Sequence, residues 1–357
     1  MAWERTPRIF DFALGTRYTR GVTPQWTPTD SDVHAEGRRQ SELHAAAVAA
    51  ARERFGNEVF LRGVVEVSNI CRENCHYCGM RRDNRQLDRY RARFETLADL
   101  LVHHRPAAIT DINIQSGEDP VAARELVLPL VRTLRRETPL GISVCLGTLA
   151  PSITRELQEA GATMYIIKFE VSDPLLYRNL EAPGTLEERG GHIRWLHSEG
   201  WHVSSGFIAG LPGESSRAAL QNLNFAAQLP LIGCSVSPFV PGDETPLSSS
   251  PAASLDLTLN CMASLRRMRP DWIIPAVSAL NIARPDGGYR RGLRTGANLC
   301  TINLTPESVR SDYLLYKRDR FIMNEARILE ALEAEGLRPS STSLAEHFRR
   351  EFAMTLA

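Results

Sequence analysis

Residues 59–78 read VFLRGVVEVSNICRENCHYC, an apolar run that ends in a short polar stretch and three closely spaced cysteines. The valine-rich run predicts a strand over 59–67, because β-branched side chains fit a pleated, buried surface. Cys71, Cys75 and Cys78 follow at spacings of four and three, so one loop can bring all three thiols together. The stretch therefore joins a buried strand directly to a candidate metal site.

Similar apolar runs recur along the chain and alternate with helical patterns. Strands are predicted at 59–67, 110–114, 141–146, 163–169, 202–209, 233–237, 272–278 and 298–304. Helices are predicted near 94–104, 121–136, 151–160, 185–199, 215–228 and 255–268. Strands separated by helices run parallel, and eight of them predict an α/β fold, a closed (β/α)8 TIM-type barrel rather than an open sheet.

The segments on either side of this alternation are expected to be accessory. The first 40 residues are rich in Pro, Thr, Asp and Arg and show no clear period, which predicts an extension. A helix is predicted from Ser41 to Phe55, ending at Gly56, and helices at 319–336 and 343–353 are expected to cover the outside of the barrel. The expected division is an N-terminal extension at 1–40, the barrel at 41–340 and a C-terminal helix at 341–357.

Composition excludes several classes of protein. The 357 residues include 42 basic and 42 acidic side chains, and a net charge of zero argues against a nucleic-acid or anionic-membrane partner. No apolar run reaches the roughly 20 residues that span a bilayer, and the first residues lack the apolar segment of a secretory signal. Seven cysteines, three of them bunched, fit reduced thiols, so we expect a cytoplasmic protein.

The three cysteines favour an iron–sulfur cluster. Thiolates select zinc or iron–sulfur clusters, but structural zinc takes four ligands, and the next cysteine, Cys145, lies 67 residues beyond Cys78. A [4Fe–4S] cube held by three cysteines leaves one iron open to a cofactor or substrate. The alternatives are three buried structural cysteines or a zinc site completed by His76.

The motif Cys-x3-Cys-x2-Cys after the first barrel strand, with Tyr77 just before its last cysteine, resembles the radical S-adenosylmethionine (SAM) superfamily. The resemblance implies that Cys71, Cys75 and Cys78 hold a [4Fe–4S] cluster whose open iron binds SAM. One electron then cleaves SAM to methionine and a 5′-deoxyadenosyl radical. It also implies that Tyr77 packs against the adenine, and a reductant such as flavodoxin or ferredoxin is the expected partner.

One turn after the second predicted strand matches the part of the superfamily's pocket that grips the SAM ammonium. The matching residues are Gln115, Ser116, Gly117 and Glu118. A carboxylate complements a cation there, and a glycine lets the backbone approach closely. The alternative is an ordinary strand-to-helix turn, in which Glu118 and Asp119 favour a helix N-terminus.

Three later segments match the rest of that pocket. Lys168 and Glu170 are two residues apart and share a face of the fourth strand, where Glu170 matches a SAM contact and an inward ion pair is the alternative. Arg189 matches an arginine that forks onto the SAM carboxylate. Ile208, in a glycine-rich strand end, matches an adenine contact.

The resemblance covers about residues 40–340 and indicates the biotin-synthase-like group. Residues 69–91 and 115–120 look like its [FeFe]-hydrogenase maturase branch, and parts of 55–61 and 296–339 look like methylornithine synthase. The departures are two. Biotin synthase carries further cluster cysteines at two positions where this chain has Ser143 and Ser204. Methylornithine synthase grips its product with an arginine and an aspartate, and this chain lacks them at the matching places, Ser235 and 277–280.

The leading hypothesis is a radical SAM enzyme of mutase or lyase type that rearranges or fragments a small, amino-acid-like substrate inside the barrel. The candidate substrate contacts, each of which can equally be a packing residue, are Ser143, Ser204, Ser235, Ser237, Ser278 and Thr301. The alternatives are a metallocofactor maturase acting on an organometallic or thiol-containing precursor, a pyridoxal enzyme using Lys168, and a non-catalytic metal scaffold. The roles of Cys145 and Cys300, both on predicted strands, stay open.

Overall fold

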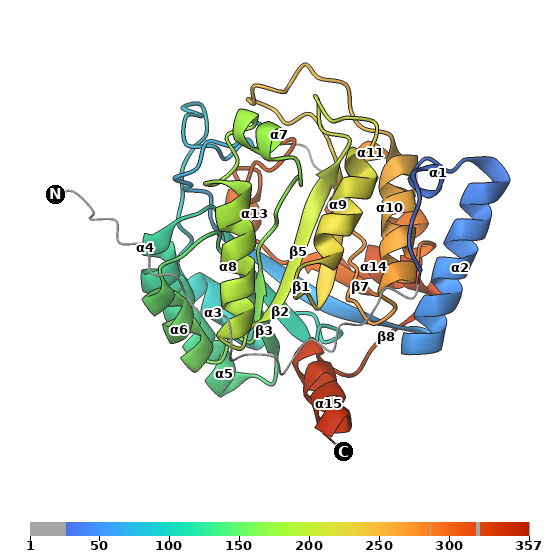
Figure 1. Ribbon diagram of the computed structural model, residues 1–357. Helices are drawn as coiled ribbons and strands as arrows, with labels where there is room; N and C mark the ends of the chain where they lie inside the picture. The colour runs from blue at the N-terminus through green and yellow to red at the C-terminus, as the bar shows by residue number, and fades with distance from the viewer. Residues whose placement is uncertain (1–25, 286, 319–321, 357) are drawn as a thin grey trace, which may run out of the picture.

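The computed structural model describes residues 26–285, 287–318 and 322–356. Most of the predicted N-terminal extension lies outside the described residues. The described chain begins with α1 (Asp30–Val33) and α2 (Gly37–Phe55), so the first long helix starts four residues before the predicted one. Helix α2 packs against the outer side of α10 (Leu255–Met268), which itself packs against the barrel wall (Figure 1).

Seven parallel strands of the described chain form most of the barrel wall, in the order β6-β5-β4-β3-β2-β1-β7. Their outward side chains pack under the surrounding helices, which explains why both faces of these strands are apolar for much of their length. The strands are β1 (Glu58–Ser68), β2 (Asp111–Ser116), β3 (Gly141–Cys145), β4 (Met164–Ile166), β5 (His202–Ala209), β6 (Gly233–Pro238) and β7 (Leu299–Asn303).

The segment predicted as the seventh strand, 272–278, closes the ring without forming a regular strand. Single parallel bridges join Ile273 to Gly233 of β6 and Pro275 to Leu299 of β7. Pro275 has no N–H to donate to a ladder. Side chains replace other ladder bonds: the amide of Ile274 donates to Asn298 Oδ1 at 2.8 Å. The predicted eight-membered barrel is therefore present, with an irregular seventh member.

Helices follow the strands as the sequence predicts. Between successive wall segments lie α3 (Phe94–His103), α6 (Pro151–Glu159), α8 (Leu186–Ser198), α9 (Ala218–Ala227) and α10. Shorter helices that were not predicted are α7 (Pro174–Asn179), α11 (Ala279–Ala283), α12 (Gly288–Leu293) and α13 (Glu307–Arg310). The C-terminal region forms α14 (Glu325–Ala334), the short strand β8 (Arg338–Pro339) and α15 (Leu344–Leu356).

The helix predicted over 121–136 is divided. It consists of α4 (Pro120–Ala122), a wider π-helical turn (Ala123–Val127) and α5 (Leu128–Glu137). Pro129 explains the wide turn. It cannot donate to the carbonyl of Glu125 four residues earlier, and its ring crowds that carbonyl.

The amino end of the barrel is closed by apolar packing. Leu344 of α15 packs with the first inward-facing residues of the wall, and Phe348 packs against this cluster, which comprises Phe60, Met164, Ile273 and Leu299. The backbone N–H of Leu344 donates to both carboxylate oxygens of Asp111, at 3.1 and 3.0 Å. The last helix was expected on the outside of the barrel. It lies instead beneath it (Figure 1), which leaves the carboxyl end of the strands for a cavity.

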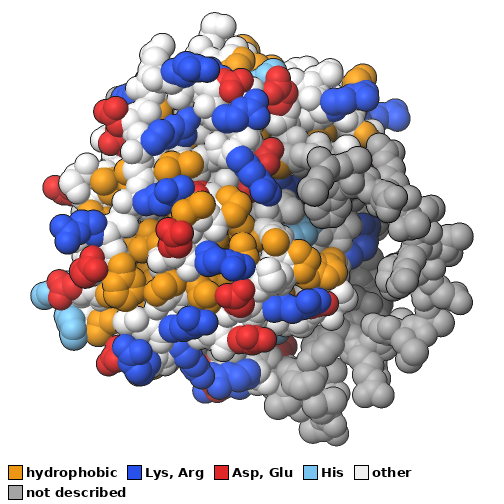
Figure 2. All heavy atoms as spheres, turned by 90° about the vertical axis from the view of Figure 1, so that its left-hand side faces the viewer, with side chains coloured by type: hydrophobic (Ala, Val, Ile, Leu, Met, Phe, Trp, Pro, Cys, Tyr) orange, Lys and Arg blue, Asp and Glu red, His pale blue; other side chains and the backbone are white. Residues whose placement is uncertain are grey.

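The outer surface carries both signs of charge. Figure 2 shows the side that lies at the left of Figure 1, where Lys and Arg side chains alternate with Asp and Glu among apolar residues. Among the residues that the structure describes, no helix has the length and apolarity needed to cross a membrane.

Candidate active site

A cavity of about 390 Å³ lies inside the barrel and opens at the carboxyl ends of the strands. Every predicted site residue except Ser143 lines it. Ser143 is buried, and its hydroxyl donates to Ile112 O and Asn113 Oδ1, both at 3.1 Å. The structure does not support a substrate contact for Ser143, because Ser143 does not line the cavity, whereas Asn113, its register partner on β2, does.

The cysteine loop, residues 69–93 between β1 and α3, places its three thiols on the cavity wall. Burial raises the pKa of Cys71 and Cys75, and burial together with the charge of Cys71 raises the pKa of Cys78 to about 12. Without metal these thiols keep their protons, and iron would supply the positive charge that favours thiolates. The donor set is thus three soft ligands on one cavity, as a site-differentiated cluster needs.

The turn after β2 presses against this loop. The backbone N–H of Glu118 donates to Cys71 Sγ at 3.3 Å, a contact that would stabilise a thiolate. A Cβ at Gly117 would lie 2.3 Å from the carbonyl oxygen of Ile70, so only glycine allows this approach. The predicted SAM turn and the predicted cluster loop are therefore one packed unit.

Arg89 holds the cysteine loop in shape, a role that we did not predict from the sequence. Its guanidinium donates to four main-chain carbonyls, those of Asn69, Met80, Arg81 and Asn84, at 2.7 to 3.1 Å. A signal was present, because Arg89 lies in one of the stretches that carry the family resemblance. Loop carbonyls without ladder partners need such donors.

His76 faces away from the thiols. Its Nε2 lies 3.1 Å from Glu181 Oε1, its backbone N–H donates to Leu180 O, and it does not line the cavity. Within the described ranges no three His, Cys, Asp or Glu side chains are arranged to hold a single metal ion. The geometry thus gives no support to the alternative of a zinc site completed by His76.

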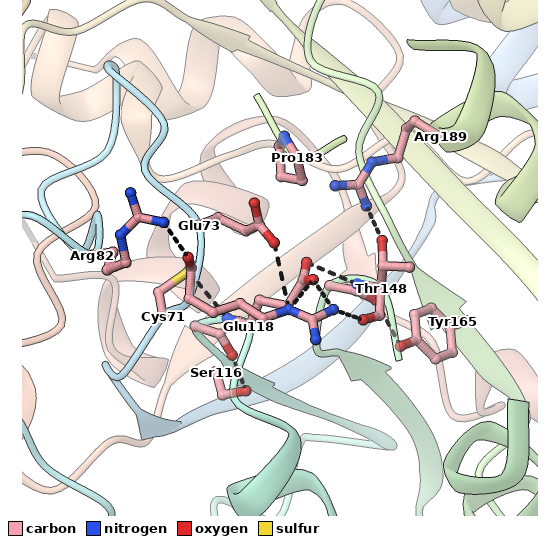
Figure 3. A network of polar contacts seen from close by, with 12 residues as sticks. Cys71, Glu73, Arg82, Ser116, Glu118, Thr148, Tyr165, Pro183 and Arg189 are labelled. Atoms are coloured by element: carbon pink, nitrogen blue, oxygen red, sulfur yellow. Dashed lines mark hydrogen bonds and ion pairs between the residues drawn. The ribbon is translucent and has the colours of Figure 1, made fainter. Parts of the chain in front are cut away.

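Glu118 is the centre of a polar network rather than an open carboxylate. Its Oε1 accepts from Arg72 Nε and Nη2, at 2.9 and 2.6 Å, and its Oε2 accepts from the backbone N–H of Thr148 at 2.9 Å (Figure 3). Asp119 caps α4 and pairs with Arg91, as the structural alternative for this turn predicts. Glu118 still lines the cavity, but its geometry favours positioning the turn over gripping a cation by itself.

Arg189 is a buried guanidinium directed toward the same network. Its Nε donates to the Tyr177 hydroxyl at 3.3 Å. Its Nη1 donates to Thr148 Oγ1 at 3.2 Å (Figure 3). No carboxylate of the described residues lies within ion-pair distance of it. A buried guanidinium oriented by neutral groups can receive a ligand carboxylate in two-point contact.

Lys168 and Glu170 form the predicted inward ion pair, with Nζ 3.0 Å from Oε2. Burial works to lower the pKa of Lys168, but the charge of Glu170 outweighs it, and the net pKa is raised. An ammonium is a poor nucleophile, which disfavours a Schiff-base role. Glu170 has a φ of 63°, a left-handed backbone conformation that is costly for a residue other than glycine and is frequent at functional sites.

Among the cavity residues that the sequence analysis missed are Arg62, Glu66 and Asn303. Arg62 and Glu66 of β1 lie on the same face of the strand, and Asn303 of β7 lies beside Glu66, donating to its Oε1 at 3.2 Å. Arg62 is 9% exposed, its Nε has no hydrogen-bond partner, and Nη2 lies 3.5 Å from Thr301 Oγ1. Side chains two apart in a strand share a face, and this rule could have shown that Arg62 and Glu66 lie on one face of 59–67. We applied the rule to the pair on the fourth strand but not to the first strand.

The hydroxyls at the later strand ends divide into two groups. Ser204 and Ser235 donate to backbone carbonyls of neighbouring strands, Gly233 O and Ser205 O, both at 3.3 Å. These contacts favour packing roles for the two serines. The remaining predicted contacts on the cavity wall are Ser237, Ser278 and Thr301.

Comparisons with known proteins agree with this geometry. The model of the radical SAM superfamily matches residues 65–226. The chain is 33% identical over 265 residues to the [FeFe] hydrogenase maturase subunit HydE of Thermotoga maritima, covering 74% of this chain and 76% of that protein. It is 28% identical to 3-methylornithine synthase of Methanosarcina barkeri, over 84% and 85% of the two chains. The crystal structure of methylornithine synthase aligns with a TM-score of 0.77 at 24% identity, over 88% of this chain and 95% of that one, which shows a common fold.

Proposed function

The chain belongs to the radical SAM superfamily, and on this premise we propose that it rearranges or fragments a small, amino-acid-like substrate inside its barrel. Members of this superfamily use a [4Fe–4S] cluster and SAM. The observation that carries the proposal is one cavity inside the barrel whose wall bears the three loop thiols and, deeper in the barrel, the buried cation of Arg62.

The residues of the cavity wall fit both the [4Fe–4S] cluster and SAM. Cys71, Cys75 and Cys78 would hold the cluster, and Arg189 would receive the SAM carboxylate, with Gln115, Ser116, Gly117, Tyr77 and Ile208 around the rest of the molecule. Together the bound cluster and SAM supply a 5′-deoxyadenosyl radical after transfer of one electron from a reductant such as flavodoxin or ferredoxin. The protein binds, orients and excludes water.

Charge inside the cavity supports an amino-acid-like substrate. Of the cations that the described residues place on this wall, Lys168 is neutralised by Glu170 and Arg189 is assigned to the SAM carboxylate, which leaves Arg62 to attract a substrate anion. Glu66 contributes a negative charge to the same wall, close to Asn303 and Gln115. A small molecule with a carboxylate and an ammonium would complement Arg62 and Glu66, and a buried, incompletely bonded guanidinium gains most from such a ligand.

A maturase acting on an organometallic or thiol-containing precursor is the second candidate. The 33% identity to HydE over three-quarters of the chain favours it. Ser235 also stands where the resemblance to methylornithine synthase requires a substrate-binding arginine. A precursor with anionic ligands would use Arg62 as well, so the two candidates differ in substrate rather than in the site.

The first test is anaerobic reconstitution of the full chain with iron and sulfide. We expect about four irons per chain and, with dithionite and SAM, release of 5′-deoxyadenosine. Cys234→Ala is a suitable control, because Cys234 is a buried cysteine outside the cavity wall. A chain that takes up no iron, or takes it up without cleaving SAM, would overturn the proposal.

The second test concerns the substrate. A panel of free amino acids should include one that accelerates 5′-deoxyadenosine release, and Arg62→Gln should weaken that acceleration about tenfold or more. Arg39→Gln, on the exposed side of the N-terminal helix, is the matched arginine control. Acceleration by thiol-containing iron complexes, with none by amino acids, would favour the maturase candidate instead.

A further inference from the structure

A fourth thiol lies on the cavity wall. Cys145 is the last residue of β3 and lines the same cavity as the three loop cysteines. Its register partner on β2 is Gln115, whose own partner on β1 is Glu66, so these three side chains stand at one level of the barrel. The other cysteines of the described chain, Cys234, Cys261 and Cys300, are buried and do not line the cavity.

A second observation points to a ligand in the same cavity. The Nε of Arg62, itself nine-tenths buried, has no hydrogen-bond partner, and Arg62 lines the same cavity. The charges of Arg62 and Lys168 both act on Cys145. An anionic group held by Arg62 would therefore bring the body of a small substrate into the neighbourhood of the Cys145 sulfur.

We propose that Cys145 donates the hydrogen atom that quenches the carbon-centred radical of the substrate. This inference rests on the proposed function. A C–H bond forms and the S–H bond breaks, so the substrate radical is reduced and the thiol becomes a thiyl radical. One electron from a low-potential protein donor, of the class that reduces the cluster, and one proton from water restore the thiol. The cycle therefore takes two electrons and one proton, and SAM is consumed rather than regenerated.

The chemistry of the wall favours a thiol for this step. An S–H bond is weaker than an aliphatic C–H bond, whereas the O–H and N–H bonds of the neighbouring hydroxyl and amide groups are stronger. Hydrogen transfer also requires the protonated thiol, and burial raises the pKa of Cys145 to about 11, which keeps the hydrogen in place at neutral pH. The three loop cysteines would be cluster ligands and would carry no S–H bond.

The closing experiment uses SAM alone as the probe. The reconstituted full chain is incubated with SAM and dithionite in D2O, and 5′-deoxyadenosine is analysed by mass spectrometry. With the cavity empty of substrate, the Cys145 S–D group is expected to place one deuterium in the nucleoside. Cys145→Ser should lower the deuterated fraction about tenfold, since its O–D bond is too strong, and Cys145→Ala should do the same. Cys234→Ala should leave the fraction unchanged.

The outcomes separate this inference from the proposed function. Unlabelled 5′-deoxyadenosine from the parent chain, or a label that persists in Cys145→Ser and Cys145→Ala, would overturn the role of Cys145 and leave SAM cleavage standing. Absence of 5′-deoxyadenosine from every variant would overturn the proposed function and this inference with it. An independent readout is alkylation of the cluster-free chain by iodoacetamide, in which Cys145 should react about tenfold faster than Cys234, because it faces the cavity. Equal rates would contradict its placement.

Discussion

At the carboxyl end of the barrel the strands carry a cavity with charged and sulfur-bearing walls, whereas at the amino end the same strands end in a sealed apolar cluster. The open end holds Glu66, Cys145 and the cysteine loop, and Arg62 lies deeper on the same cavity wall. The closed end holds Phe60 and Leu344 of α15, packed under Leu299, which forms part of the cavity floor. Position along a strand, rather than which strand a residue belongs to, therefore decides between chemistry and packing.

This division has an energetic reason. A buried ion pair such as Lys168–Glu170, or a buried cation such as Arg62, adds little to stability, because desolvation offsets its favourable contacts. Apolar burial at the closed end contributes roughly 25 cal/mol for each Å² removed from water. Substitutions at the open end should therefore change function more than folding, and those at the closed end should do the reverse.

The largest effect is expected at the open end, for Cys75→Ala. The loss of one of three thiol ligands should reduce iron from about four per chain to less than one, and SAM cleavage should fall by more than about a thousandfold. Because Cys75 acts otherwise as a small apolar side chain, unfolding of the cluster-free chain should change by only about 1 kcal/mol. Iron analysis and urea unfolding measure the two quantities, and retention of cleavage by this variant would contradict the assignment of the cluster.

At the closed end Phe60→Ala should have the opposite profile. Removing a buried phenylalanine from the apolar seal should cost about 3–5 kcal/mol of unfolding free energy. Iron uptake per folded molecule should stay at the parent value. Val121→Ala, at a side chain that is 42% exposed, is the control and should change the unfolding free energy by less than about 0.5 kcal/mol. A Phe60→Ala chain with parental stability but without iron would reverse the contrast between the two ends.

The sequence could predict most of the wall but not the depth of each side chain within it. Apolar runs followed by polar residues located the strands, and the motif of the cysteine loop located the site. Alternation shows that Ser143 and Cys145 share a face, yet only Cys145 lines the cavity, whereas the hydroxyl of Ser143 is bonded to Asn113 of the neighbouring strand. Arg62 was overlooked because a charge within an apolar strand does not by itself indicate which way it points.

Hydrogen bonds between segments far apart in the chain could not be predicted from the sequence either. The segment around Pro275 has the composition of a strand, but the side chains of Asn298 and Arg266 take the ladder positions of Ile274 N and Trp272 O, and only part of the main-chain ladder forms. The position of α15 beneath the barrel depends on Asp111 accepting from the start of that helix, 233 residues further along the chain. No local pattern records such a pairing.

Asp111 offers a smaller test, through pH, of how the closed end is held. Burial raises its pKa from 3.8 to about 6. The folded chain therefore binds the proton more tightly than the unfolded chain, so this group favours folding at low pH. As the pH rises from about 4 to 6, the contribution of the Asp111 carboxyl to the free energy of unfolding is lost, and this loss is at most about 3 kcal/mol. Urea unfolding of the cluster-free chain measures this effect. Between pH 4.5 and pH 7 the free energy of unfolding should fall more for the parent than for Asp111→Asn. Equal falls would mean that Asp111 does not titrate in this range.

The smallest expected effect is at the open end, for His76→Ala, and it sharpens the comparison because His76 lies inside the cluster motif without facing the cavity. Its partner is Glu181, an exposed carboxylate 3.1 Å away, and exposed pairs add little to stability. We expect parental iron content, SAM cleavage and apparent melting temperature, and no zinc by elemental analysis.

Tyr77→Ala is the contrasting variant. The Tyr77 ring lines the cavity, so SAM cleavage should fall in this variant although Tyr77 and His76 are adjacent. Loss of metal in His76→Ala alone would show that the loop holds its ion through an imidazole. The division of the barrel would then rest on a different metal centre.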